Sequence, residues 1–252
     1  MTEKQFYVKQ FYVEYQPHVC LKSGGVAGFE ALVRWCHPTR GRIGPDDFIS
    51  IAEDTGLILP LGDWVLKTAC AQMKVWQNNG QNAALVISVN LSGRQLFQPN
   101  ITKRVAQILE ETGLPPKNLR LEITESVLIQ NYSEAAKKLH QLSSLGIKLA
   151  IDDFGTGYSS LGRLRNFSVD VLKIDRMFIH DMKIAAEGVE IVQAIVALGH
   201  GLQMSVNAEG IESDCQLDKL RKMGCDEGQG FLFAASLKPK AAAAWLAQNH
   251  RW

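Results

Sequence analysis

Residues 147–161 read IKLAIDDFGTGYSSL, a short apolar run that ends in two carboxylates, Asp152 and Asp153. Other apolar runs of the chain also end in a polar side chain, at Glu30, Asn90, Glu122, Lys173, Glu209 and Gln229. In a barrel, the carboxyl ends of parallel strands meet at one rim, where residues far apart in sequence come together. The repeated pattern therefore predicts a barrel of parallel strands with one polar site at its C-terminal rim.

Strand-like runs alternate with helix-like runs along nearly the whole chain. We expect strands at 11–16, 26–33, 84–90, 119–124, 147–152, 170–174, 203–208 and 227–232. Between them we expect helices at 46–55, 61–79, 99–112, 132–145, 188–201, 213–223 and 239–248. Strands that alternate with helices of this length favour a mostly parallel sheet. The number of strands favours closure of that sheet into a barrel.

The start of the chain departs from this regular alternation. The strand at 11–16 is followed by the short polar segment HVCLKSGGVAG, and then directly by the strand at 26–33. A connection this short cannot hold a crossover helix, so the two strands should form an antiparallel hairpin. The expected fold class is α/β, an irregular (β/α)8 TIM-like barrel with one antiparallel strand near the N-terminus.

The composition is that of an ordinary globular protein. The 252-residue chain carries 27 basic and 26 acidic residues, a net charge of +1, and 46% hydrophobic residues. This balance gives no strong field to attract a nucleic-acid polymer or a membrane surface, and no stretch reaches transmembrane length. Five cysteines without C-x-x-C spacing fit reduced thiols. We expect one domain, residues 1–252, in the cytoplasm or as the cytoplasmic part of a larger protein.

The residue types at the predicted rim indicate a metal site. Carboxylate and amide oxygens with one lysine, and no Cys/His cluster, suit a hard divalent cation rather than zinc. This pattern leaves the reaction open. A barrel lyase or racemase, in which Mg²⁺ stabilises an enolate and Lys173 acts as the base, is one alternative.

A set of motifs in a fixed order narrows the choice: YQP, FEALVRW, GLILPLGDWVL, SVNLS, LEITES, IDDFGTGYSSL, LKID, AEGIE and GCDEGQGF. Over about residues 11–236 this set resembles the EAL domain family, the bacterial phosphodiesterases of cyclic di-GMP (c-di-GMP). The resemblance implies an irregular barrel, two divalent cations (Mg²⁺ or Mn²⁺), and hydrolysis of c-di-GMP to linear pGpG. It also implies a homodimer, with sensor or regulatory domains possible in a longer parent chain.

The resemblance further implies a role for each site residue. The expected metal ligands are Glu30, Asn90, Glu122, Asp152, Asp153 and Glu209. Lys173 is expected to orient the attacking water and stabilise a phosphoryl oxygen, Glu209 to accept a proton, and Glu125, in the loop before Ser126, to anchor the loop after Asp153. The expected substrate contacts are Gln16, Leu32, Arg34, Asp175 and Gln229. For Gln16 and Gln229 a contact with metal-bound water is the alternative, and Asp175 is expected to hydrogen-bond either Lys173 or such a water.

Two similar segments compete for one motif. AEGVE at 186–190 runs straight into a helical pattern, whereas AEGIE at 208–212 follows a strand-like run. We therefore expect Glu187 to be an acid at a helix N-terminus and Glu209 to be the site residue. A catalytically silent c-di-GMP receptor is the second functional hypothesis. It would predict the loss of ligands such as Glu30 or Glu209, and both are present.

Overall fold

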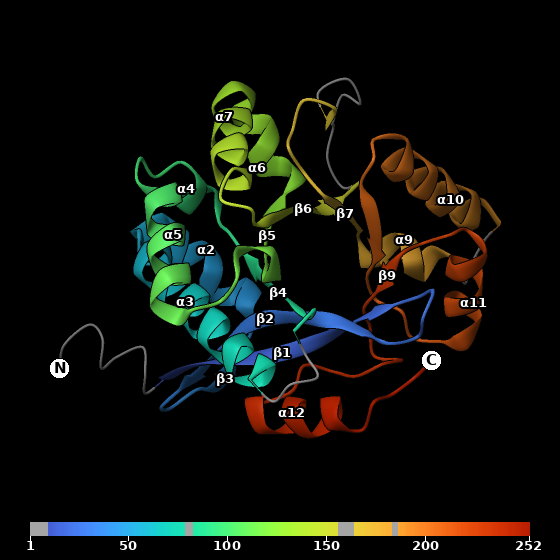
Figure 1. Cartoon of the computed structure of the whole chain (residues 1–252), viewed down its shortest axis with the longest axis horizontal. Coiled ribbons are helices and arrows are strands. Elements are labelled where there is room, and N and C mark those ends of the chain that lie inside the picture. The colour runs from blue at the N-terminus through green and yellow to red at the C-terminus, as the bar shows by residue number, and fades with distance from the viewer. Residues whose placement is uncertain (1–9, 79–82, 156–163, 183–185) are drawn as a thin grey trace.

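The computed structural model describes residues 10–78, 83–155, 164–182 and 186–252 (Figure 1). Its strands are β1 (Phe11–Cys20), β2 (Val26–His37), β3 (Gly41–Ile43), β4 (Val86–Asn90), β5 (Leu119–Thr124), β6 (Lys148–Phe154), β7 (Val171–Ile174), β8 (Ser205–Ala208) and β9 (Glu227–Gly228). Its helices are α2 (Pro45–Thr55), α3 (Ile58–Gln77), α4 (Gly93–Leu96), α5 (Ile101–Thr112), the 3-10 helix η1 (Pro116–Asn118), α6 (Glu125–Gln130), α7 (Tyr132–Ser143), α9 (Arg176–Asp181), α10 (Ala186–Gly201), α11 (Asp214–Lys222) and α12 (Pro239–Ala247).

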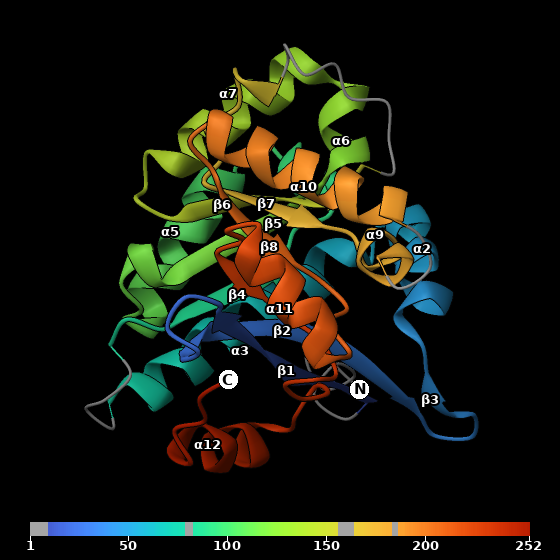
Figure 2. The same cartoon turned by 90° about the vertical axis from the view of Figure 1, so that its right-hand side faces the viewer.

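The sheet closes into a barrel because β1 pairs with both β2 and β9. Both of these pairings are antiparallel. The remaining barrel strands, in the order β2, β4, β5, β6, β7, β8 and β9, are each parallel to the next. The predicted irregular α/β barrel with one antiparallel strand is therefore confirmed. The helices pack around the outside, and Figure 2 shows α10 beside β7 and β8 and the β2–β3 hairpin projecting from the barrel.

Helix α2 illustrates how local sequence sets an element's bounds. Pro45 occupies its first turn, where the missing N–H costs nothing, and Asp46 and Asp47 follow in the same turn. Gly56 ends the helix in the left-handed conformation, with φ of 78°. This helix was predicted at 46–55, and the prediction is confirmed to within one residue.

The expected strand at 227–232 is wrong beyond its first two residues. Only Glu227 and Gly228 are strand, because the chain then turns against the segment that follows β8. The N–H of Gln229 donates to the carbonyl of Ala208, and a Cβ on Gly230 would lie 2.1 Å from the carbonyl oxygen of Ile211. That close approach of two backbones fixes the turn, and apolar residues beyond it gave the segment its strand-like appearance. The short β3 and the helices α4, α6 and α9 were not predicted.

A buried polar layer lies inside the barrel, one step below the rim. Arg120 precedes Glu122 by two residues on β5 and so shares its inward face. Its guanidinium donates two hydrogen bonds, of 2.8 and 3.0 Å, to the carboxylate of Glu227. His18, on β1, lies 4.0 Å from the same carboxylate and is 1% exposed. Burial and the charge of Arg120 lower the pKa of His18 to about 4, so this imidazole is neutral at pH 7.

Replacing Glu227 with glutamine is expected to lower the free energy of unfolding at pH 7 by about 3 kcal/mol. Burial raises the pKa of Glu227, but the charge and hydrogen bonds of Arg120 outweigh it and bring the pKa to about 2. A carboxyl whose pKa is lower in the folded state stabilises the fold above its unfolded pKa, and this stabilisation is lost as the pH falls toward the folded pKa. The gap between wild type and Glu227→Gln should therefore narrow between about pH 4.5 and pH 2.

Urea denaturation at pH 7 and pH 3 measures this gap. Glu111→Gln is the matched control, because Glu111 pairs with Lys67 at the surface, 2.6 Å away, where an ion pair contributes little. Equal stability of wild type and Glu227→Gln at pH 7 would show that the buried pair does not stabilise the fold.

Candidate active site

Lys173 lies at the centre of a cluster of carboxylates inside the barrel mouth. Its ammonium group is 2.5 Å from Glu122, 2.6 Å from Glu209, 3.0 Å from Asp152 and 3.9 Å from Glu30. The lysine is 1% exposed. Burial lowers the pKa of Lys173, but the four carboxylates outweigh burial and hold it well above its ordinary value.

Strand register explains why these side chains meet. Asn90 is level with Glu122, and Glu122 is level with Ala150, two residues before Asp152, so the site residues of β4, β5 and β6 lie within two residues of one another in register. Lys173 is level with Asn207, two residues before Glu209. Residues that were predicted at successive strand ends therefore come together at one rim, as expected.

The cluster carries more negative than positive charge. Burial raises the pKa of Glu30, Glu122 and Glu209, and repulsion among the carboxylates adds to it, so each pKa lies above its ordinary value although Lys173 lowers it. The Oε1 oxygen of Glu122 is buried and has no hydrogen-bond partner among the described residues. Several buried oxygen donors around a single amine form a site that is suited to a further cation.

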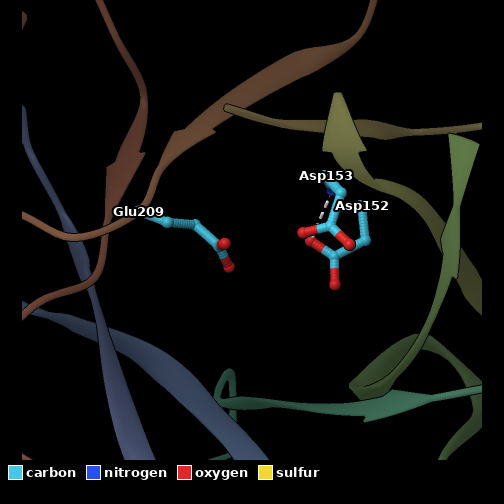
Figure 3. A group of neighbouring side chains, drawn as sticks. All are labelled: Asp152, Asp153 and Glu209. Carbon is cyan, nitrogen blue, oxygen red and sulfur yellow. Dashed lines mark hydrogen bonds between the residues drawn. The ribbon is translucent and has the colours of Figure 1, made fainter. Parts of the chain in front are cut away.

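Asp152, Asp153 and Glu209 form a possible metal site within this cluster. Each offers a carboxylate oxygen, and these oxygens lie within 4.8 Å of one another. Figure 3 shows Glu209 reaching from one side of the barrel mouth towards the two aspartates on β6. Asp153 has a φ of 53°, unusual for a residue other than glycine, and its N–H donates to Asp152 at 3.0 Å. Burial, Asp152 and Asp175 raise the pKa of Asp153 to about 6.

Two amide side chains bind Glu30, and a third, Gln16, contacts one of them. Asn90 donates to one carboxylate oxygen at 2.7 Å, and Gln229 donates to the other at 2.8 Å. Gln229 also donates to Gln16 at 2.9 Å, and Gln16 donates to the carbonyl of Ala234 at 3.1 Å. The expected substrate residues Gln16 and Gln229 thus also orient a predicted metal ligand.

Two cavities adjoin the cluster. One, of about 410 Å³, is lined by residues that include Arg34, Asn90 and Asp153. The other, of about 550 Å³, is lined by residues that include Gln16, Glu209 and Gln229. Asp152 and Leu32 line both cavities. The carboxylate cluster therefore lies between two spaces, which share Leu32 and Asp152 and otherwise have different linings.

Two expected site residues act as structural supports. Glu125, expected in a loop, is the first residue of α6, where it is 2% exposed and accepts a hydrogen bond from the N–H of Gly155 at 2.9 Å. Asp175 caps α9 and accepts from the N–H of Met177 at 2.7 Å, because β7 ends one residue earlier. Its side chain is hydrogen-bonded to Asp153. Asp153 was not among its expected partners, and Lys173, which was, pairs with the carboxylates described above. Residues 156–163 of the expected loop lie outside the described residues.

Arg34 lies where the sequence placed it, but with a partner that sequence reasoning missed. Its guanidinium is 3.0 Å from the carboxylate of Glu14 on β1, which was not among the expected site residues. The signal was present in the strand alternation, since Glu14 lies two residues before Gln16 and shares its inward face.

The two similar segments, AEGVE and AEGIE, lie in different kinds of element. Glu187 lies in the first turn of α10, and Glu209 follows β8 and contacts Lys173.

Among the described helices, none combines the length and the apolar character that a membrane span requires.

Comparison with known proteins identifies the family. The EAL domain family model matches residues 2–236. The chain is 42% identical over 243 residues to the cyclic di-GMP phosphodiesterase NbdA of Pseudomonas aeruginosa, covering 96% of this chain and 31% of NbdA. It is 42% identical over 236 residues to the cyclic di-GMP phosphodiesterase PdeR of Escherichia coli, covering 94% of this chain and 35% of PdeR. The chain thus spans about a third of the length of these relatives.

The fold of a solved relative agrees with this. The structure of the PaMucR phosphodiesterase in complex with c-di-GMP superimposes with a TM-score of 0.89 at 41% identity, covering 93% of this chain and 95% of that one. Family model, relatives and fold coincide over the segment that carries the carboxylate cluster. The chain therefore belongs to the EAL domain family.

Proposed function

We propose that this chain hydrolyses one phosphodiester bond of c-di-GMP to give linear pGpG, in a reaction that depends on divalent cations. The observation that carries the proposal is the cluster around Lys173, where buried carboxylates from several strands lie between two cavities. The named activities of NbdA and PdeR, and the c-di-GMP bound to PaMucR, support this choice of substrate.

The residues present fit hard divalent cations, and we propose two of them, Mg²⁺ or Mn²⁺. The donors are oxygen atoms, three carboxylates converge within 4.8 Å, and a buried oxygen of Glu122 is without a partner among the described residues. The proposed ligands are Glu30, Asn90, Glu122, Asp152, Asp153 and Glu209. When bound, such cations supply Lewis acidity that stabilises negative charge on the phosphoryl oxygens.

The chain's own side chains supply the rest of the chemistry. The buried ammonium of Lys173 is proposed to stabilise charge that develops on a phosphoryl oxygen and to orient the attacking water. Glu209, whose carboxylate lies 2.6 Å from the ammonium of Lys173, is proposed to accept a proton. Arg34, on the wall of the first cavity, provides a fork of N–H groups that matches a phosphate. Gln16, Leu32 and Gln229 line the second cavity and are proposed to contact the nucleotide, and Asp175 to act through Asp153.

We propose that residues 1–252 form a single EAL-type domain, that it acts as a homodimer, and that it works beside sensor or regulatory domains. The greater length of NbdA and PdeR supports the last of these. The five cysteines are all free, which fits the reducing cytoplasm expected from the sequence.

Incubating the purified chain with c-di-GMP and Mg²⁺, and following nucleotides by chromatography, tests the proposal. We expect pGpG as the product. Tight binding of uncut c-di-GMP would instead identify a receptor. Neither binding nor cleavage, together with turnover in a panel of carboxylate substrates, would favour the lyase or racemase alternative.

Replacing Glu125 with alanine is expected to lower kcat by about 10- to 100-fold, the usual effect of losing a group that orients metal ligands. The substitution removes the acceptor for the N–H of Gly155, two residues past Asp153. Mn²⁺ affinity and kcat measured together check this prediction. Glu134→Ala is the matched control, because Glu134 lies in the first turn of α7 and is exposed. A Glu125→Ala protein with wild-type kcat and Mn²⁺ affinity would remove Glu125 from the site.

A further inference from the structure

Glu14 is a buried carboxylate beside the proposed site that the mechanism above does not use. It lies on β1 opposite Leu32 of β2 and is 5% exposed. One of its oxygens accepts three hydrogen bonds, from Arg34 Nε at 3.0 Å, Arg42 Nη2 at 3.1 Å and Ser236 Oγ at 2.7 Å. These donors come from β2, from β3 and from the segment that precedes α12.

Three contacts hold the guanidinium of Arg34. Besides the bond to Glu14, Nη1 donates to the carbonyl of Val33 at 3.0 Å and Nη2 donates to Ser236 at 3.1 Å. These bonds use three of the five N–H groups of an arginine. Arg34 also lines the first cavity together with Asn90 and Asp152.

Glu14 keeps its negative charge because its surroundings lower its pKa. Burial raises the pKa of Glu14, but the hydrogen bonds from Ser236 and Arg34 and the charges of the two arginines outweigh it and lower the pKa below its ordinary value. The carboxylate is therefore ionised at neutral pH, and its bond to Arg34 is charge-assisted.

We propose that Glu14 is a positioning residue, which holds the guanidinium of Arg34 at the wall of the first cavity in the orientation that receives a phosphate of the substrate. The phosphate in this inference rests on the proposed function, whereas the holding of Arg34 does not. A long arginine side chain loses rotamer freedom when it binds an anion, and a partner that fixes it beforehand removes part of that cost. Ser236 contacts both Glu14 and Arg34, so it completes the same support.

A purely structural role for Glu14 makes a different prediction. Glu14 also pairs with Arg42, whose side chain is 59% exposed, and so joins the β2–β3 hairpin to β1. If this were its whole role, Glu14→Gln would lower stability and leave the Michaelis constant for the substrate unchanged. Positioning instead affects substrate binding, and it does so only while Arg34 is present.

The test is a double-mutant cycle with Glu14→Gln, Arg34→Ala and the combined variant, measured as kcat and KM for c-di-GMP. A contact made equally in the ground state and the transition state affects KM and leaves kcat unchanged. We expect Glu14→Gln to raise KM by about tenfold while kcat changes by less than about threefold. In the Arg34→Ala background the same substitution should change KM by less than about twofold.

Asp63→Asn is the matched control, because the Nε of Arg104 lies 2.7 Å from the carboxylate of Asp63 and neither residue lines either cavity. It removes an equivalent carboxylate from an arginine Nε, and its KM should equal that of the wild type. Equal effects of Glu14→Gln in the two backgrounds, or an unchanged KM, would overturn the proposal.

A second readout does not depend on the substrate. In a ¹⁵N spectrum of the free protein, the Nε–H of Arg34 should exchange slowly in wild type and in Asp63→Asn, and rapidly in Glu14→Gln. Slow exchange that persists in Glu14→Gln would overturn the proposal even if c-di-GMP is turned over. If c-di-GMP is neither bound nor cut, the proposed function fails, and this readout still decides whether Glu14 holds Arg34.

Discussion

Replacing Lys173 with methionine is expected to lower kcat for c-di-GMP by about 10³-fold, the upper end of the loss when one preorganised charge-stabilising donor is removed. Methionine nearly conserves the length of the side chain and removes its charge together with its N–H donors. Metal affinity should stay the same or rise, because in the wild type Lys173 competes with cations for the four carboxylates around it. The combination of lost rate and retained metal is what distinguishes Lys173 from the proposed ligands.

The same substitution should make stability depend more strongly on metal. Without metal, Lys173→Met leaves buried carboxylates with no counter-charge, which destabilises a fold. Added Mg²⁺ should therefore raise Tm more in Lys173→Met than in wild type. Lys67→Met is the control, since Lys67 is 54% exposed and pairs with Glu111 at the surface. A Lys173→Met protein that keeps its kcat would contradict the central role of this residue.

Replacing Asp152 with asparagine is the second change with a large expected effect, a loss of turnover of about 10³-fold or more. Asp152 belongs to the three-carboxylate group, lies 3.0 Å from Lys173 and lines both cavities. Asparagine keeps the shape and removes the charge that a hard cation needs, so Mn²⁺ affinity should fall as well.

Calorimetric titration with Mn²⁺, together with the rate of pGpG formation, measures both effects. Asp218→Asn is the matched control, because Asp218 is exposed on α11. Lost activity with unchanged Mn²⁺ affinity would remove Asp152 from the proposed ligands, and unchanged turnover would remove it from the site.

The parts of the site that follow from strand ends could be predicted from the sequence. Glu30, Glu122, Asp152 and Lys173 each end an apolar run, and the parallel register brings them to one rim. The preference for Glu209 over Glu187 rested on the same reasoning, and of the two only Glu209 follows a strand and contacts Lys173. Periodicity along one segment is enough to place such residues.

Features that depend on contacts between distant segments could not be predicted in this way. The strand expected at 227–232 stops early because Gly230 packs against the backbone of Ile211. Asp175 lies past the end of β7 and caps α9, so its side chain does not continue the alternation of the strand. The pairing of Glu14 with Arg34 crosses from β1 to β2 and depends on the offset of two antiparallel strands. Local patterns place each residue on an element, but the fold decides its partner.

The most direct test of the proposed activity is the addition of metal to protein that has been stripped with a chelator. The stripped chain is mixed with c-di-GMP, Mn²⁺ or Mg²⁺ is then added stepwise, and pGpG is quantified at each step. We predict no pGpG before addition and a rate that rises with the metal until the carboxylate cluster is saturated. Formation of pGpG in excess chelator, or none in excess metal with c-di-GMP bound, would contradict a metal-dependent phosphodiesterase site around Lys173.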